Sequence, residues 1–127
     1  NDGRVISNFI VQALQGKSLT VYGEGKQTRS FCFVDDLING MLLLMNSSSN
    51  GPINIGNPDE NSIKTIAEII RSKINPKLEI INEPLPSDDP IRRKPNISLA
   101  INKLNWQPKI NLNDGLDKTI AYFQKII

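Results

Sequence analysis

The sequence predicts an α/β chain of the α+β kind, in which a few short strands are flanked by helices. Several stretches show helical patterns, whereas the strand-like runs are short and irregularly spaced, without the regular βαβ alternation of a doubly wound sheet. The length of 127 residues fits one domain, because a chain of this size can bury well over half of its unfolded surface in a single core.

The first third of the chain is predicted as a helix, two strands and a second helix. Apolar residues recur at helical spacing over residues 5–14, and Gly16 stands where a C-cap glycine is expected. Apolar, β-branched and aromatic runs at residues 19–22 and 30–34 lie on either side of GEGKQT, which indicates two strands joined by a loop. The helix that follows carries an interior glycine, Gly40, which costs about 1 kcal/mol relative to alanine.

The rest of the chain is predicted to continue with short strands and helices. Ser62 is expected to cap one helix, and Ser98 is expected to cap a short helix that ends at Leu104. Residues 82–96 hold four prolines and are predicted to form an extended loop. The remaining predicted elements are strands at residues 53–55 and 78–81 and helices at residues 63–74 and 112–126.

Composition excludes several classes of function. Fifteen Lys and Arg against thirteen Asp and Glu leave a net charge of +2, too near balance to predict a nucleic-acid or membrane protein. The chain has no histidine, so a zinc site or a Ser-His-Asp triad is not expected, and its single cysteine excludes an internal disulfide. The longest strongly apolar run, residues 41–45, is far shorter than a membrane span. A soluble protein in a reducing compartment is expected.

The stretch YGEGKQTRSF, residues 22–31, raises the question of whether its glycines grip a phosphate. A dinucleotide fingerprint needs three glycines between a strand and a helix, and a P-loop needs Gly-Lys-Ser/Thr at the start of a helix. Gly23 and Gly25 flank a single residue, and a strand is predicted to follow them. The spacing therefore favours a hairpin loop with solvated charges over a phosphate-binding loop.

Two further stretches could bind anions. SDDPIRRKP, residues 87–95, sets three basic residues in a proline-rich loop, and arginine is well shaped for phosphate or carboxylate groups. A solvated charged loop is the alternative. Arg4 lies at the start of the first helix, where a bound anion would also meet the amides of the first turn.

Other prominent residues are interpreted as structural. Trp106 is expected to anchor the last helix, and Cys32 is expected to be a small buried apolar residue because no histidine is present to activate it. Asp35 and Asp36 are expected to begin the second helix, where acidic side chains suit the positive end of the helix dipole.

Four phrases in this order resemble the C-terminal part of the UDP-glucuronate decarboxylase (UDP-xylose synthase) family: GRVISNFIVQALQG, LTVYGEGKQTRSFCFVDDLINGM, INIGNP and DDPIRRKPNI. That family belongs to the extended short-chain dehydrogenase/reductase superfamily, with the nucleotide-sugar epimerases and dehydratases. The resemblance runs over residues 1–127. It implies a small C-terminal domain that binds the nucleotide sugar, with the N-terminal Rossmann half absent.

The resemblance also implies a reaction and a cofactor. Members of the family use NAD, held by a Rossmann domain with a glycine-rich loop and a Tyr-x-x-x-Lys pair, to convert UDP-glucuronate to UDP-xylose and carbon dioxide. This chain has no such glycine triplet, and its one matching pair, Tyr22 and Lys26, lies in a glycine-rich turn. The chain alone is therefore expected to be inactive, to bind no NAD and no metal, and to need its own missing Rossmann domain as a partner.

Residue roles are implied by matching positions. Thr20 and Tyr22 would line the nucleobase pocket, and Arg29 would contact the pyrophosphate. Arg93, with Arg92 as its neighbour, would close over the nucleotide from the proline-rich loop. At the sugar, Arg4 would hold the departing carboxylate by electrostatic stabilisation, for which its permanent charge is suited. The last predicted contacts, which shape the same wall, are Val5 and Asn8.

Alternatives stay open at this point. A nucleotide-sugar epimerase or 4,6-dehydratase would carry much of the same pattern, and a non-catalytic nucleotide-sugar-binding or dimerisation module is a third reading. The complete enzyme is expected to be a homodimer that pairs through helices of its Rossmann half. It is expected in the cytoplasm, or in the Golgi lumen of a eukaryote.

Overall fold

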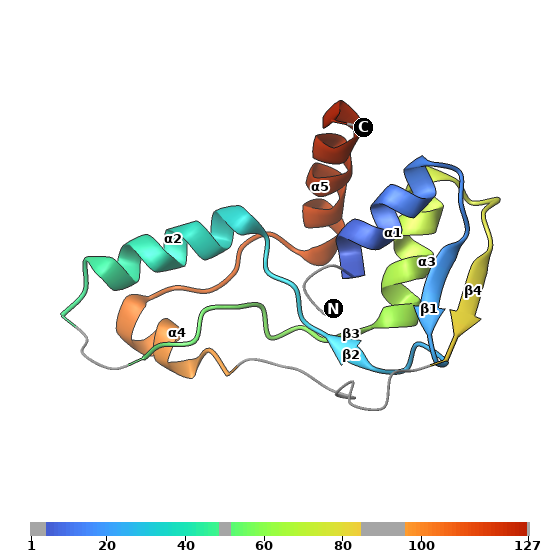
Figure 1. Ribbon diagram of the computed structural model, residues 1–127. Coiled ribbons are helices and arrows are strands. Elements are labelled where there is room, and N and C mark those ends of the chain that lie inside the picture. Colours follow the sequence, from blue (N-terminus) through green and yellow to red (C-terminus); the bar gives the residue numbers. More distant parts are fainter. Residues whose placement is uncertain (1–4, 49–51, 85–95, 127) are drawn as a thin grey trace. The chain divides into compact units, whose positions relative to one another are not determined.

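The computed structural model describes residues 5–48, 52–84 and 96–126 of the chain (Figure 1). The chain divides into two compact units. Unit 1 contains residues 1–29, 61–92 and 116–127, and unit 2 contains residues 30–60 and 93–115. Each unit has its own buried apolar residues, and helices lie at the five places where the sequence predicts them.

Unit 1 is built on two parallel strands, β1 (Leu19–Tyr22) and β4 (Ile80–Glu83), which pair from Leu19 with Ile80 to Tyr22 with Glu83. Helices α1 (Val5–Leu14) and α3 (Ile63–Ile74) contact β1 and each other, and Figure 1 shows them beside the two strands. Parallel strands need a crossover connection, and α3 lies in the connection from β1 to β4. The largest fully buried side chains of the unit are Ile10, Leu19, Val21, Ile66, Ile70 and Leu116.

A second strand pair in unit 1 corrects the predicted hairpin. β2 (Thr28–Arg29) pairs antiparallel with β3 (Asn61–Ser62), so β1 and β2 are not partners and GEGKQT is not a hairpin loop. The predicted strand at residues 30–34 is wrong, since residues 30–33 have no regular structure and a helix begins at Val34. The strand predicted at residues 78–81 lies two residues later, because its register is set by β1.

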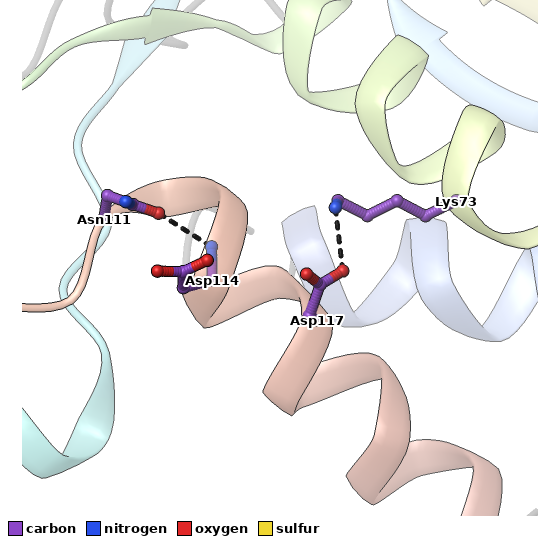
Figure 2. A network of polar contacts seen from close by, with 4 residues as sticks. All are labelled: Lys73, Asn111, Asp114 and Asp117. Atoms are coloured by element: carbon purple, nitrogen blue, oxygen red, sulfur yellow. Dashed lines mark hydrogen bonds and ion pairs between the residues drawn. The ribbon is translucent and has the colours of Figure 1, made fainter.

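Helix ends follow local rules in three places and depart from them in one. Gly16 follows α1 with φ of +74°, the left-handed conformation expected after a helix. The Ser62 side chain caps α3 by accepting from the Thr65 amide at 3.1 Å, and the Asn111 side chain accepts from the Asp114 amide at 2.8 Å (Figure 2).

The exception is α4 (Ser98–Leu104), for which the predicted serine cap is wrong. The Asn96 side chain accepts hydrogen bonds from both the amide and the hydroxyl of Ser98, at 3.0 and 2.8 Å. Asparagine can satisfy the backbone two residues on in this way, so the serine hydroxyl is engaged and cannot cap the helix itself.

Unit 2 packs α2 (Val34–Met45) against α4 around Trp106. The predicted strand at 53–55 is wrong, since these residues have no regular structure. Instead Ile53 and Ile55 pack against the buried cluster that contains Ile97, Ala100, Leu104 and Trp106. Trp106 is buried as expected, but its indole nitrogen donates to the Asp36 carbonyl oxygen of α2 at 3.0 Å, so it anchors the segment after α4 to that helix.

The last helix, α5 (Leu112–Ile126), begins in unit 2 and continues in unit 1. Within unit 1 it is tied to α3 by an ion pair between Lys73 Nζ and Asp117 Oδ1 at 2.7 Å (Figure 2). Throughout the described ranges, the helices are too short or too polar to cross a membrane.

Candidate functional site

The predicted nucleotide-binding residues that the structure describes all lie in unit 1. Thr20 and Tyr22 are on β1, Arg29 is on β2, and Val5 and Asn8 are on α1. The predicted residues outside the described ranges are Arg4, Arg92 and Arg93.

Thr20 is held by a side chain that the sequence alone did not single out. Gln12 on α1 accepts a hydrogen bond from the Thr20 amide through Oε1 and donates one to Thr20 Oγ1 through Nε2, each at 3.1 Å. Val5, Asn8 and Gln12 are spaced three and four residues apart, so they lie along one face of α1. The helical spacing of Gln12 from two predicted residues was the signal that could have found it.

The backbone of β1 presents two different edges. The amides of Leu19 and Gly23 donate to carbonyls of the β4 segment, at 2.9 Å to Glu79 and 2.6 Å to Glu83. Because backbone groups alternate along a strand, the intervening Thr20 and Tyr22 direct their amides and carbonyls to the opposite edge. The bond from the Thr20 amide to Gln12 agrees with this alternation.

Tyr22 is the more exposed of the two predicted nucleobase residues, with 49% of its surface accessible. Its carbonyl oxygen accepts from the Gly25 amide and from Gln27 Nε2, each at 3.3 Å. These bonds close the loop after β1 and leave the phenol ring exposed. The ring is therefore placed where a flat ligand could pack on it.

The glycine loop, residues 23–27, braces α3 and does not form a phosphate cradle. Its Gly25 and Gln27 carbonyls accept hydrogen bonds from the Lys64 and Ile63 amides at the start of α3, at 3.0 and 2.9 Å. Those amides would otherwise be among the unpaired donors of a helix N-terminus. A phosphate loop directs amides at its ligand, whereas this loop directs carbonyls at the helix.

Gly25 is required at its position. Its φ is +72°, and a Cβ atom there would lie 2.8 Å from Val21 Cγ1 and 2.9 Å from Lys64 Cβ. Only glycine fits both the left-handed conformation and the space. The prediction that the glycines make a turn and no phosphate grip is consistent with this geometry.

A cavity of about 590 Å³ lies next to the loop, lined by Val21, Glu24, Gly25, Lys26, Ser62, Lys64, Ile80 and Asn82. Side chains alternate between the faces of a strand, so Val21 lies on the face of β1 opposite to Thr20 and Tyr22. The cavity therefore does not coincide with the predicted nucleobase residues. At its rim, Lys26 and Glu24 form an exposed ion pair at 2.7 Å, which lowers the pKa of Glu24 and raises the pKa of Lys26.

Arg29 is buried, with 4% of its surface accessible, and its Nη1 donates to the Thr28 carbonyl oxygen at 2.7 Å. A buried guanidinium must have its charge compensated by acceptors. Because so little of the side chain is accessible, contact with a pyrophosphate requires part of the guanidinium to become exposed. Asn8 is exposed on α1, and Val5 is partly buried.

In unit 2, Asp36 has a role that its place at a helix start did not predict. The side chain is buried, and its Oδ2 accepts from the amides of Lys109 and Ile110 at 3.0 and 2.9 Å. Asp36 thus joins α2 to the segment before α5. Burial raises the pKa of the nearby Cys32 thiol, and the Asp36 charge raises it further. A thiol held neutral in this way is a poor nucleophile, in agreement with the structural reading of Cys32.

The helix α2 also carries a group of exposed apolar side chains. They are Val34, Leu37, Ile38, Met41, Leu42, Leu43 and Met45. Isolated exposed apolar residues are ordinary, whereas a group of them on one helix is typical of an interaction surface. Elsewhere in the unit a cavity of about 310 Å³ is lined by residues 57–59, 97, 101 and 107–111.

The chain is similar to known proteins over nearly its whole length. Residues 1–56 match the NAD dependent epimerase/dehydratase family. UDP-glucuronic acid decarboxylase 1 of Danio rerio is 51% identical over 125 residues, which are 98% of this chain and 30% of that protein. UDP-glucuronic acid decarboxylase 1 of Arabidopsis thaliana is 46% identical over 127 residues, 100% of this chain and 29% of that protein. The chain thus spans about a third of the length of these relatives.

Solved structures of related enzymes are also similar to this chain. A UDP-glucose 4-epimerase from Thermotoga maritima superposes with a TM-score of 0.92 at 27% identity, over 96% of this chain and 40% of that one. A UDP-glucuronic acid 4-epimerase from Bacillus cereus, in complex with UDP-glucuronic acid and NAD, gives a TM-score of 0.89 at 28% identity, over 97% and 40%. The resemblance seen in the sequence is confirmed: the chain is similar to UDP-glucuronic acid decarboxylases over nearly its whole length, and residues 1–56 match the NAD dependent epimerase/dehydratase family.

Proposed function

We propose that this chain is the substrate-binding part of an NAD-dependent UDP-glucuronate decarboxylase, which converts UDP-glucuronate to UDP-xylose and carbon dioxide. One observation carries the proposal: about half of the residues are identical to proteins named UDP-glucuronic acid decarboxylase, over 98% of the chain. The two epimerases of known structure described above are 27% and 28% identical to this chain. This difference in sequence identity favours the decarboxylase over an epimerase or a 4,6-dehydratase.

The geometry of β1 supports a nucleobase site at Thr20 and Tyr22. Both residues direct backbone groups to the edge away from β4, where the Thr20 amide and the Tyr22 carbonyl are already bonded within the chain. The Thr20 carbonyl and the Tyr22 amide on the same edge offer an acceptor and a donor close together. The edge of a uracil ring needs such a pair, because it carries carbonyl oxygens beside an N–H group. The exposed Tyr22 ring is a surface on which the base or ribose can pack.

In this proposal, arginine side chains bind the negatively charged groups of the nucleotide sugar. Arg29 contacts the pyrophosphate when its guanidinium becomes exposed, and Arg93, with Arg92 beside it, closes over the nucleotide. Charge-assisted hydrogen bonds of this kind contribute about 1.5 to 3 kcal/mol each. Arg4 holds the carboxylate of the sugar, and Val5 and Asn8 shape the wall beside it.

NAD belongs to the remainder of the complete protein. When bound, it supplies hydride chemistry at the sugar, and this chain's residues contribute binding and orientation of the nucleotide sugar. The sequence of 127 residues contains no glycine triplet of the NAD-binding kind, so the chain alone is inactive under this proposal.

The partner of this chain in the complete protein is its NAD-binding Rossmann domain. The exposed apolar side chains of α2 support this partnership, because they form a surface suited to contact with another domain. Homodimerisation through the Rossmann half would then leave this chain outside the dimer interface.

The test measures carbon dioxide release from UDP-glucuronate by the complete protein. Formation of carbon dioxide and UDP-xylose supports the proposal. Interconversion of UDP-glucose and UDP-galactose without decarboxylation would establish an epimerase instead, and water loss from dTDP-glucose would establish a dehydratase. Binding of UDP-sugars without turnover of any of them would indicate a non-catalytic module.

A further inference from the structure

The hydrogen bond from the Thr20 amide to Gln12 fixes the donor and acceptor of the second hydrogen bond between these two residues. A backbone amide can only donate, so the Gln12 atom 3.1 Å from the Thr20 amide is the carbonyl oxygen Oε1. The other side-chain atom is then Nε2, which can only donate and lies 3.1 Å from Thr20 Oγ1. The orientation of this amide therefore follows from chemistry, where in other settings oxygen and nitrogen are hard to tell apart.

The Thr20 hydroxyl has its polarity set by this arrangement. A hydroxyl carries one hydrogen and two lone pairs, and Gln12 occupies one lone pair while offering Oγ1 no acceptor. In the described ranges, no hydrogen bond has the Thr20 hydroxyl as its donor. Its hydrogen is thus directed away from Gln12 and stays available for donation to another acceptor.

We propose that Gln12 is a specificity-determining positioning residue, which fixes the Thr20 hydroxyl as a hydrogen-bond donor and so selects a carbonyl oxygen over an amino group on the pyrimidine ring. A uracil has a carbonyl oxygen at ring position 4, where a cytosine has an amino group. The proposal rests on the proposed function, in which Thr20 lines the nucleobase pocket. Gln12 acts through Thr20 and touches no ligand itself.

The test changes the polarity and preserves the contacts. In Gln12→Glu the carboxylate can accept from the Thr20 amide and also from the Thr20 hydroxyl, which must rotate to donate. Thr20 then presents only lone pairs to the ligand. The dissociation constants of UDP and CDP are measured by calorimetry on the complete protein at about pH 8, where an ordinary glutamate is ionised.

Wild-type protein is expected to prefer UDP, and the ratio of the CDP to the UDP dissociation constant is expected to fall about tenfold in Gln12→Glu, the effect of roughly one hydrogen bond. Gln12→Leu, which removes both bonds and lets the hydroxyl rotate, is expected to lower the ratio by a smaller factor. A merely structural role of Gln12 would lower the melting temperature and leave the ratio unchanged.

Thr20→Val supplies the matched background, because valine keeps the shape of threonine and lacks the hydroxyl. In that background Gln12→Glu is expected to leave the ratio unchanged, as a double-mutant cycle requires. An unchanged ratio in both Gln12 variants, or an equal change in the Thr20→Val background, overturns the inference alone. Absence of UDP binding by the wild-type protein overturns the nucleobase site and this inference together.

Discussion

Replacing Gly25 by alanine tests the role of the glycine loop as a brace for α3. Alanine at φ of +72° carries a backbone cost of about 1 to 2 kcal/mol. Its Cβ would also lie 2.8 Å from Val21 Cγ1, 2.9 Å from Lys64 Cβ and 3.1 Å from the Lys64 amide nitrogen. The Lys64 atoms belong to or adjoin the backbone and cannot swing aside, so overpacking adds about 1 to 3 kcal/mol.

Alanine also lowers the conformational entropy of the unfolded chain, which offsets the loss in the free energy of unfolding by about 0.4 to 1 kcal/mol. We therefore expect Gly25→Ala to lower the free energy of unfolding by about 1 to 5 kcal/mol. Gly16→Ala is the matched control, since Gly16 has nearly the same φ, +74°, but nothing within 4 Å of the added Cβ. It is expected to cost only the backbone term, about 1 to 2 kcal/mol before the entropy correction.

Urea unfolding of the two variants gives both values, and hydrogen exchange at the Ile63 and Lys64 amides reports whether the brace has loosened. These amides donate to the Gln27 and Gly25 carbonyls, so Gly25→Ala should speed their exchange and Gly16→Ala should not. Equal destabilisation by the two substitutions would show that the close contacts at Gly25 carry no energy and would refute the reasoning.

Four further predictions concern unit 2. Gly40→Ala should destabilise by about 0 to 2 kcal/mol, since a Cβ there lies 2.8 Å from Ile55 Cγ2 and 3.1 Å from Trp106 Cε2, which outweighs the gain in helix propensity. Gly115→Ala, whose nearest contact is 3.5 Å, should stabilise by about 0.5 to 1 kcal/mol; urea unfolding that gave both the same sign would contradict the packing argument. Asp36→Ala should cost about 2 to 4 kcal/mol in thermal or urea unfolding, because it removes the acceptor of two amide hydrogen bonds; a loss below about 0.5 kcal/mol would be inconsistent with that role. The raised pKa of Cys32 should make its alkylation at about pH 8 slower than that of a free thiol, and the rate should still rise at a pH where a free thiol is fully ionised. Folded Asp36→Asn lacks the Asp36 charge, so the pKa of Cys32 should be lower in this variant. An identical pH profile of alkylation in the two proteins would disprove the coupling.

The helices were predictable because their signals are local. Residues 5–14 and 63–74 carry apolar stripes, and the glycine or serine at their ends is the residue that caps them, so these boundaries agree with the structure. The strands were less predictable. The partner of β1 lies some sixty positions further along the chain, and the predicted hairpin with residues 30–34 failed because pairing depends on that distant partner.

The candidate site shows the same division. Family phrases in the sequence indicated Thr20, Tyr22 and Arg29, but they did not show that Arg29 is buried or that Gln12 holds Thr20. The hydrogen bonds of Asp36 with residues 109 and 110 were equally invisible, because a carboxylate near a helix start has a sufficient local explanation.

The sequence by itself determined the helices and the resemblance to UDP-glucuronic acid decarboxylases, since both depend on residue types at short or recurring spacing. Only the tertiary structure decided which strands pair, which atoms a side chain at Gly25 or Gly40 would meet, and that Gln12 holds the Thr20 side chain. Those outcomes depend on contacts between residues that only folding brings together, and the local spacing of residue types does not specify which residues these are.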